Sequence, residues 1–256
     1  MNKTLFRSVL SALALVVFLA LSVTAAWLMQ GQSPMPSAGE ISALQMQART
    51  DTGAELQLKR AAAAGMPEAQ LALGRMLLLR GGSGELSQAL AWLNSAAARP
   101  GDVSAAARTE LGKLYFRGAA GMPRDYQKAL ALLDAAAQQD SAVAAYYLGL
   151  IYRNGLAGPA DKAAAASWML KSAGQHIPAA MFIVANMYLA GEGLPQNDGE
   201  ARKWLEKAAE MEHPEALQLM AIGLHEGTMG FPRDEKLAQQ QMQEAAHALT
   251  HRAIDP

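Results

Sequence analysis

Two histidines, His247 and His251, form the pair in this 256-residue sequence whose spacing best suits metal chemistry. Residues four apart share one face of a helix, and two imidazoles placed in this way can ligate one ion. A stable site needs further ligands, and neither a carboxylate nor a third histidine accompanies the pair at a fixed spacing. We therefore predict a solvated helix end here, with no bound metal and no cofactor.

The other reactive residue types form no catalytic signature. Gly81-Gly82-Ser83-Gly84 resembles a nucleophile elbow but lacks the second flanking glycine and a preceding strand, so we interpret it as a flexible turn. His225, followed by Glu226, lies near the predicted end of a helix, where a cation suits the helix dipole. The 14 methionines are scattered or occupy core positions such as Met220, which argues against copper handling. The sequence contains no cysteine and therefore no thiol nucleophile, and we predict that the protein is not an enzyme.

Composition and charge exclude several functional classes. The chain is 51% hydrophobic and 18% charged, which is too apolar for disorder and too polar for a multi-span membrane protein. The net charge of −1 gives no basic excess, so we expect no nucleic-acid partner. Residues 51–171 hold 13 basic and 10 acidic side chains, whereas 172–256 hold 6 and 12. This asymmetry either orients a partner or a second copy, or reflects two ordinary solvated faces.

Residues 1–29 have the composition of an export segment. Lys3 and Arg7 precede an uncharged apolar stretch, Ser8 to Met29, and a basic start before a long apolar run is typical of targeting segments. A cleaved signal peptide would use the small residues around Thr24 as its cleavage region. An uncleaved anchor would extend about 33 Å as a helix, enough to cross a bilayer, with Trp27 at the far interface. Both interpretations remain open at this point.

Either interpretation exports the rest of the chain. We expect a single-pass inner-membrane protein with its remaining residues in the periplasm, or a periplasmic protein if the segment is cleaved. Residues 30–53 follow, and their start contains Pro34 and Pro36 among Gly and Ser. Such a composition is typical of linkers, so we predict a flexible linker over 30–53.

The remainder of the chain repeats itself. Ala, a large apolar residue followed by a small one, Tyr and Gly recur at fixed spacing, and the inner small residue falls at 74, 112, 149, 185 and 221, which are 36 to 38 residues apart. The first and last copies are degenerate, since Leu77 and Leu224 replace the Tyr and Gly81 comes one residue late. The clearest copies are Ala107-Leu111-Gly112-Tyr115-Gly118 and Ala144-Leu148-Gly149-Tyr152-Gly155. The spacings of four place these residues on one helical face, and the last glycine suits a helix end. Each unit therefore begins with a first helix.

A second pattern follows each first helix with the same period. Potential N-caps stand at Asp125, Asp161, Asn197 and Asp234, each four residues before an alanine. An apolar or aromatic residue and paired small residues follow, as in Ala165-Trp168-Ser172-Ala173. Prolines at 67, 178 and 214 mark the start of the next first helix. Each unit is thus a helical hairpin, which buries too little apolar surface to be stable alone and must stack on its neighbours.

The segments Asp125-Tyr126-Gln127-Lys128-Ala129 and Lys203-Trp204-Leu205, together with the Ala…Leu-Gly…Tyr…Gly spacing, resemble the Sel-1-like repeat family, which is related to tetratricopeptide repeats. The resemblance implies an all-α fold, a right-handed α-α superhelix (solenoid), that acts as a scaffold for other proteins, often in the bacterial envelope. We predict a solenoid over 54–250, with Leu56 to Ala64 as the second helix of a partial leading unit. The predicted repeats are about 67–104, 105–141, 142–177, 178–213 and 214–250. The sequence departs from the family at Gly81–Gly84, a loosened linker, and at Gln241, where Trp is usual.

Positions three before, one after and four after the inner small residue share a face of each first helix opposite the core stripe. If first helices line the concave side, these positions form a groove whose aromatic, cationic and polar residues suit recognition. From this face we predict partner contacts at Arg75, Lys113, Phe116, Tyr146, Arg153, Phe182, Asn186 and His225. Alternatively, the apolar members of the set contact the neighbouring repeat.

These observations predict an exported, membrane-tethered scaffold that binds a protein or peptide through the concave face of the solenoid. A binding module for an envelope glycan or peptidoglycan fragment is the alternative, with Tyr146 and Phe182 stacking on sugar rings. A third possibility, an envelope hydrolase, follows from related cysteine-rich repeat proteins that are credited with enzymatic activity. The lack of cysteine in this chain argues against it.

Overall fold

The starts of the helices follow the local signals in the sequence. In a computed structural model that describes residues 34–251, apart from the side chains of Ser83 and His251, the Asp125 carboxylate accepts a hydrogen bond from the Lys128 backbone N–H at 3.0 Å. Asp161, Asn197 and Asp234 cap their helices in the same way. Prolines 67, 178 and 214 each occupy the first turn of a helix. The predicted caps and starts are confirmed.

Twelve helices make up the regular structure of residues 34–251, and no strand forms there beyond an isolated bridge between Ala119 and Met122. The first helices of the hairpins are α2 (Ala38–Gln47), α4 (Pro67–Arg80), α6 (Asp102–Arg117), α8 (Ala142–Asn154), α10 (Pro178–Ala190) and α12 (Pro214–Glu226). The second helices are α3 (Thr52–Ala63), α5 (Ser83–Ala97), α7 (Tyr126–Ala137), α9 (Lys162–Gly174), α11 (Asp198–Glu210) and α13 (Glu235–His251). The all-α prediction is confirmed.

Glycines end five of the first helices. Gly81, Gly155, Gly191 and Gly227 adopt the left-handed conformation, with φ between 61° and 73°. Gly118 also has a φ of 73° but continues with an extended ψ. A side chain at such a φ is strained, which explains why glycine recurs at this position of the repeat.

The second helices end differently, because three of them place a residue with a side chain in the left-handed region. Asp140, His176 and Glu212 have φ values of 60°, 63° and 56°. Gly65, with a φ of 88°, occupies the corresponding position after α3. The turn geometry is therefore repeated even where the residue that suits it best is absent.

We expect His176→Gly to stabilise the protein by about 1 kcal/mol relative to His176→Ala, because only glycine adopts this conformation without steric cost. His176 is exposed, so the Ala variant accounts for the loss of the imidazole while it keeps the strain. Urea unfolding of both variants, followed by circular dichroism, measures the difference. Equal stabilities would show that the turn stores no strain.

The inner small residues allow the two helices of a hairpin to approach closely. A Cβ added at Gly74, Gly112 or Gly149 would lie 2.7, 2.5 or 2.7 Å from a side chain of the second helix. The side chains approached are those of Leu93, Leu133 and Met169, each fully buried. The close approach is therefore made within a hairpin, between its first and second helices.

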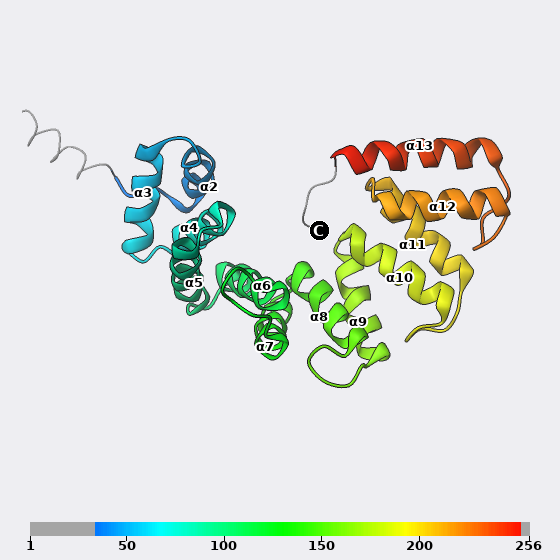
Figure 1. Cartoon of the computed structure of the whole chain (residues 1–256), viewed down its shortest axis with the longest axis horizontal. Coiled ribbons are helices and arrows are strands. Elements are labelled where there is room, and N and C mark those ends of the chain that lie inside the picture. Colours follow the sequence, from blue (N-terminus) through cyan, green and yellow to red (C-terminus); the bar gives the residue numbers. More distant parts are fainter. Residues whose placement is uncertain (1–33, 252–256) are drawn as a thin grey trace, which may run out of the picture.

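The hairpins stack side by side along an arc whose ends are α2 and α13 (Figure 1). Each second helix packs on the first helix of the following hairpin. First helices also contact each other, α4 with α6 and α6 with α8, whereas successive second helices of the described region make no comparable contacts. From α4 to α8 the first helices therefore lie closer together than the second helices, and they form the inner side of that part of the arc, as the concave-face hypothesis requires.

The predicted linker over 30–53 is wrong for residues 38–47, which form α2. The Ser37 backbone N–H donates to the Glu40 carboxylate at 2.7 Å, an arrangement typical of a helix start. Ile41, Leu44 and Ala48 are buried in the same core cluster as α3 and α4. The predicted second helix of a leading unit therefore has a first-helix partner. The loosened linker after α4 is also shorter than expected, since α5 already begins at Ser83.

The last helix is rotated relative to the other second helices. Trp168 and Trp204 are half-buried and the residues after them, Met169 and Leu205, are fully buried. In α13, however, Gln241 itself is buried at 8% exposure and the following Met242 is 45% exposed. The replacement of the usual Trp by Gln at position 241 thus coincides with a rotation of α13 about its own axis. In the described region, no further hairpin packs against α13.

The predicted export segment, residues 1–29, lies outside the described residues. Within residues 34–251, no helix combines the length and apolar character required to cross a membrane.

Candidate functional site

A pocket of about 410 Å³ opens between α2, α4 and α6. We call it the inner pocket, because α4 and α6 are contacting first helices of the inner side. Its lining combines cationic and leucine side chains and consists of Gln45, Arg75, Leu78, Leu79, Glu110, Lys113, Leu114, Arg117 and Gly118. Three successive hairpins contribute to it, so the pocket exists only when they stack.

One carboxylate organises two of the cations of the inner pocket. The Arg75 Nε atom of α4 donates to Glu110 Oε1 of α6 at 2.9 Å. Lys113 Nζ lies 3.5 Å from the other carboxylate oxygen of Glu110. The side chains of Lys113 and Glu110 are only 15% and 17% exposed, which reduces solvent screening of their charges. The lining also includes Arg117, so three cations and one carboxylate face this space.

An aromatic cluster supports Arg117. Its guanidinium donates to the hydroxyl of Tyr147 and lies 5.5 Å from the centre of the Tyr147 ring. The rings of Phe116 and Tyr146 each contact the ring of Tyr147 edge to face, at centroid distances of 5.1 Å and 5.3 Å. Phe116 also meets the ring of Tyr126. Because Tyr147 is buried, at 2% exposure, its ring gives Arg117 a fixed support.

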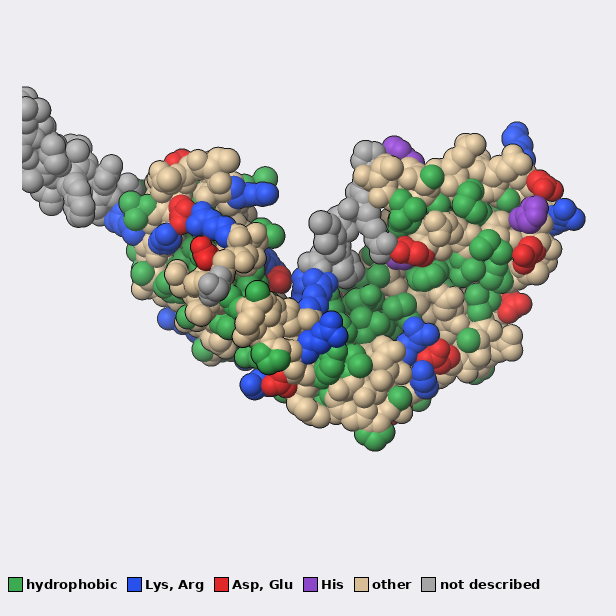
Figure 2. All heavy atoms as spheres, in the orientation of Figure 1, with side chains coloured by type: hydrophobic (Ala, Val, Ile, Leu, Met, Phe, Trp, Pro, Cys, Tyr) green, Lys and Arg blue, Asp and Glu red, His purple; other side chains and the backbone are tan. Residues whose placement is uncertain are grey.

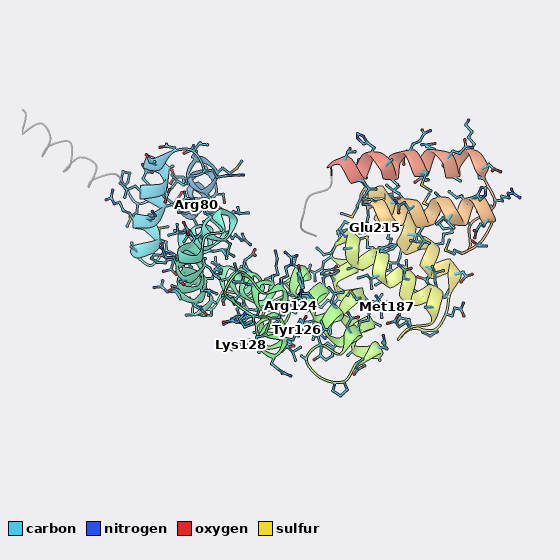
Figure 3. The ribbon with its side chains drawn as sticks, viewed as in Figure 1. Arg80, Arg124, Tyr126, Lys128, Met187 and Glu215 are labelled. Carbon is cyan, nitrogen blue, oxygen red and sulfur yellow. The ribbon has the colours of Figure 1, made fainter. Side chains whose placement is uncertain are left out.

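The start of α7 adds a further contact to the end of α6. Arg124 Nε donates to the backbone carbonyl of Arg117 at 3.1 Å. Figure 3 shows Arg124, Tyr126 and Lys128 near the base of the arc, and Lys128 Nζ lies 5.3 Å from the centre of the Tyr115 ring. Arg124 therefore ties the last turn of α6, which carries Arg117, to the loop that leads into α7 of the same hairpin.

Basic side chains gather on the visible inner surface near α6 and α8, and hydrophobic side chains extend from there toward α10 (Figure 2). The surface thus changes from basic to apolar along the inner side of the arc. Such a combination can take a partner that presents both negative charge and apolar groups.

Four of the eight predicted contact residues lie at or beside the inner pocket. Arg75 and Lys113 line it together, bridged by Glu110. Phe116 and Tyr146 belong to the aromatic cluster behind Arg117. For Phe116, which contacts Tyr147 of the next hairpin, the observed contact agrees with the alternative that apolar members pack between repeats, whereas Tyr146 contacts Tyr147 within α8.

The other four predicted residues lie on α8, α10 and α12 and have partners within the chain. Arg153 forms a two-pronged ion pair with Glu192, with both distances 2.9 Å. The ring of Phe182 stacks on that of His213 at 5.2 Å. Asn186 Nδ2 donates to the backbone carbonyl of Phe182, one turn earlier. His225 Nδ1 lies 3.3 Å from Glu235. None of these four residues is among the described residues that line the inner pocket.

The ring contact of Phe182 also bears on the glycan alternative. A sugar-binding platform presents an open aromatic face, and one face of Phe182 is covered by His213 at an interplanar angle of 26°. Tyr146 is the second ring of that hypothesis, and its ring contacts the ring of Tyr147 nearly at a right angle. These contacts do not favour sugar stacking.

The face of the first helices that lines the inner pocket is rotated about the helix axis relative to the face predicted from the sequence. The position three before the inner small residue is buried in α4 and α6, as Leu71 and Thr109 show with 8% and 6% exposure. The Thr109 hydroxyl forms a hydrogen bond with that of Ser141, the N-cap residue of α8. The inner pocket instead uses residues five after the small residue, Leu79 and Arg117. Sequence reasoning missed these two because it treated each helix by itself.

Glu110 and Gln45 were also missed. Glu110 lies three residues before Lys113, and that spacing is a signal for an ion pair along a helix. Gln45 belongs to α2, which was predicted as linker, so no signal pointed to it. In the described residues, no group of three or more His, Asp or Glu is arranged to hold a metal ion.

Glu192 is the acidic centre of an ion-pair group between α8 and the loop after α10. Hydrogen bonds from Arg153 and then Lys162 lower the pKa of Glu192 from 4.5 to about 2. Arg153 belongs to one repeat and Glu192 to the next, so this group joins two hairpins at their ends.

We expect Glu192→Gln to destabilise the protein by about 1 kcal/mol at neutral pH, the upper end for a solvent-screened pair. The folded-state pKa is depressed, so this contribution is complete above about pH 4.5 and is lost as the pH falls toward 2. Unfolding free energies of both proteins between pH 7 and pH 2 measure the change. The exposed Glu210→Gln is the matched control, and a gap that stays constant with pH would contradict the ion-pair explanation.

Comparison with known proteins agrees with this repeat architecture. Residues 67–100, 105–141, 142–176, 178–213 and 214–248 each match the family model described as Sel1 repeat, and together they make up more than half of the chain. No curated protein matches the sequence.

Two solved structures are similar to the fold. A Sel1 repeat protein from Oxalobacter formigenes is 27% identical over 82% of this chain, with a TM-score of 0.57. A protective antigen of uropathogenic Escherichia coli with an SLR fold is 23% identical over 82% of this chain, with a TM-score of 0.56, and supports the fold alone. The matches span 62% and 54% of those two proteins, so this chain covers less than two thirds of either.

Proposed function

Because this chain belongs to the Sel1 repeat family, whose solenoids commonly mediate protein–protein interaction, we propose that it is a scaffold that binds a protein partner through the inner side of the arc. The observation that carries this proposal is the inner pocket, which is assembled from α2, α4 and α6. A site that requires three stacked hairpins couples the repeat architecture directly to recognition.

The chemistry of the inner pocket favours binding over catalysis. Its lining residues are Arg, Lys, Glu, Gln, Leu and Gly, which can hold charge and apolar surface. The described lining holds no Ser, Thr, Cys or His, and its lysine, Lys113, is engaged in an ion pair with Glu110, so it offers no hydroxyl or thiol nucleophile beside an imidazole base. The role of the pocket is therefore to recognise a partner.

The proposal places the scaffold in the cell envelope. Its support is the basic start and the apolar stretch of residues 8–29, which suit either an uncleaved anchor or a cleaved signal peptide. Membrane and periplasmic fractionation, together with the intact mass of the mature protein, distinguishes the two forms. Recovery of the full-length chain in the cytoplasmic fraction would contradict export.

Site-specific photocrosslinking in cells tests the use of the inner side. Leu79 on the rim of the inner pocket is 77% exposed, so a photoreactive residue is accommodated there without disturbing the core. Gln88, exposed on the second helix α5, is the control. We expect a discrete crosslinked protein at position 79 and none at position 88. The same product at both positions, or a product only at 88, would contradict binding on the inner side.

A further inference from the structure

We propose that the inner pocket binds an acidic peptide segment of the partner, in which a Glu or Asp side chain is flanked by an apolar one. This inference rests on the proposed function and specifies the chemistry of the partner. Three cations, Arg75, Lys113 and Arg117, share the lining with one carboxylate, that of Glu110. Among the described residues, the lining therefore carries two more positive than negative charges, although the whole chain has a net charge of −1.

The positions of the cations favour a carboxylate. Arg117 is supported by the Tyr147 ring and hydroxyl, and Arg75 and Lys113 are held by the two oxygens of Glu110. Preorganised guanidinium and ammonium groups form strong charge-assisted hydrogen bonds with carboxylates, and little side-chain entropy is then lost on binding. A partner carboxylate that enters beside Glu110 meets these groups already in place.

The apolar part of the lining defines what flanks the carboxylate. Leu78, Leu79 and Leu114 border the same space, and Leu79 exposes most of its side chain. A volume of about 410 Å³ accommodates a few side chains and excludes a folded domain. The structure thus favours an extended segment that alternates acidic and apolar residues.

Glu110 has a role opposite to that of the cations. It holds Arg75 and Lys113 in position, but it also competes with an incoming carboxylate for them and repels it. Replacement of Glu110 by Gln keeps the shape and removes the negative charge. This variant should therefore bind an acidic segment more tightly, a direction that simple damage to the pocket would not produce.

Fluorescence anisotropy with the full chain tests the inference. The probe is a short labelled peptide that alternates Glu with Leu, and the reference is the same peptide with Gln in place of Glu. We expect the Glu peptide to bind, with an affinity that falls as the salt concentration rises, and the Gln peptide to bind at least about tenfold more weakly. Equal affinities for the two peptides would overturn the proposal, as would equally tight binding of a single-stranded thymidine oligonucleotide.

Variants locate the site. Lys113→Glu with Arg117→Glu should weaken binding of the Glu peptide at least about tenfold, and Glu110→Gln should strengthen it about twofold or more. Lys203→Glu with Lys207→Glu, on the second helix α11, makes the same charge change at the same spacing and should have no effect. If the first double variant fails to fold by circular dichroism, Lys113→Gln with Arg117→Gln replaces it. Equal weakening by the control pair would overturn the assignment to the inner pocket.

The two proposals fail in different ways. If position 79 crosslinks a partner in cells but the Glu peptide does not bind, the scaffold function stands and the acidic-segment inference is wrong. If position 79 gives no crosslinked protein and the Glu peptide does not bind, the inner side is not the recognition surface.

Discussion

Gly112→Val is expected to lower the free energy of unfolding by about 3 kcal/mol or more. A Cβ at this position would lie 2.5 Å from Cγ and 2.7 Å from Cδ2 of Leu133. Leu133 is fully buried, and Cγ is the branch point of its side chain, so it has little space to move away. Overpacking of a buried contact typically costs about 1–3 kcal/mol, and valine adds two methyl groups beyond the Cβ that already clashes.

Chemical unfolding followed by circular dichroism measures this loss, and Gly84→Ala is the control. Gly84 is exposed in α5, and a Cβ there would meet nothing within 4 Å. The gain in helix propensity should make that variant more stable by up to about 1 kcal/mol. Similar behaviour of the two glycines would show that the helix contact at Gly112 is not tight.

A second test of the clash at Gly112 removes the Leu133 atoms that a side chain there would strike. Leu133→Ala alone should cost about 2–5 kcal/mol through the cavity that it leaves. In that background, Gly112→Ala should cost less than in the natural protein, because the atoms that it would strike are gone. A double-mutant cycle gives the coupling between the two positions directly, and strict additivity would contradict a direct contact.

Tyr147→Ala is expected to cost about 3–5 kcal/mol, in line with the removal of other large aromatic side chains from a core. Tyr147 is 2% exposed and contacts Phe116 and Tyr146 edge to face. It also supports Arg117 through its ring and hydroxyl. The variant should therefore lower stability and the affinity of the inner pocket together, since Arg117 loses its support.

Tyr147→Phe separates the two effects. The ring and its packing remain, whereas the hydroxyl that accepts from Arg117 is removed. We expect a loss of about 1.5–3 kcal/mol, the range for a hydrogen bond to a charged group, and a smaller loss of peptide affinity than with Ala. Thermal unfolding and peptide titration of both variants provide the comparison. Equal losses from Phe and Ala would show that the ring contributes nothing beyond its hydroxyl.

Much of the fold was predictable because its signals are local. Asp161 caps α9, Gly155 ends α8 and Pro178 begins α10, each within a few residues of the sequence position that predicted it. The repeat period places these signals in the same order in successive units, so one hairpin predicts the next. Helix capping and left-handed turns depend on neighbouring residues alone.

The first hairpin was predicted only in part. Residues 38–47 follow a segment with two prolines, and Ile41, Leu44 and Ala48 are the main apolar residues that mark the buried face of α2. A helix this short is marginal in isolation. Its stability comes from packing on α3 and α4, which a linear pattern of residues does not display.

The sequence by itself determined the helical hairpins, their period and the first-helix side as the candidate surface. The tertiary structure decided which residues of that side meet. Arg75 and Lys113 were predicted, but their junction at Glu110 and the addition of Arg117 depend on how α4 and α6 lie against each other. The physical reason is that periodicity reports how a helix faces its own core, whereas a pocket between helices is set by the distance and angle at which successive hairpins pack.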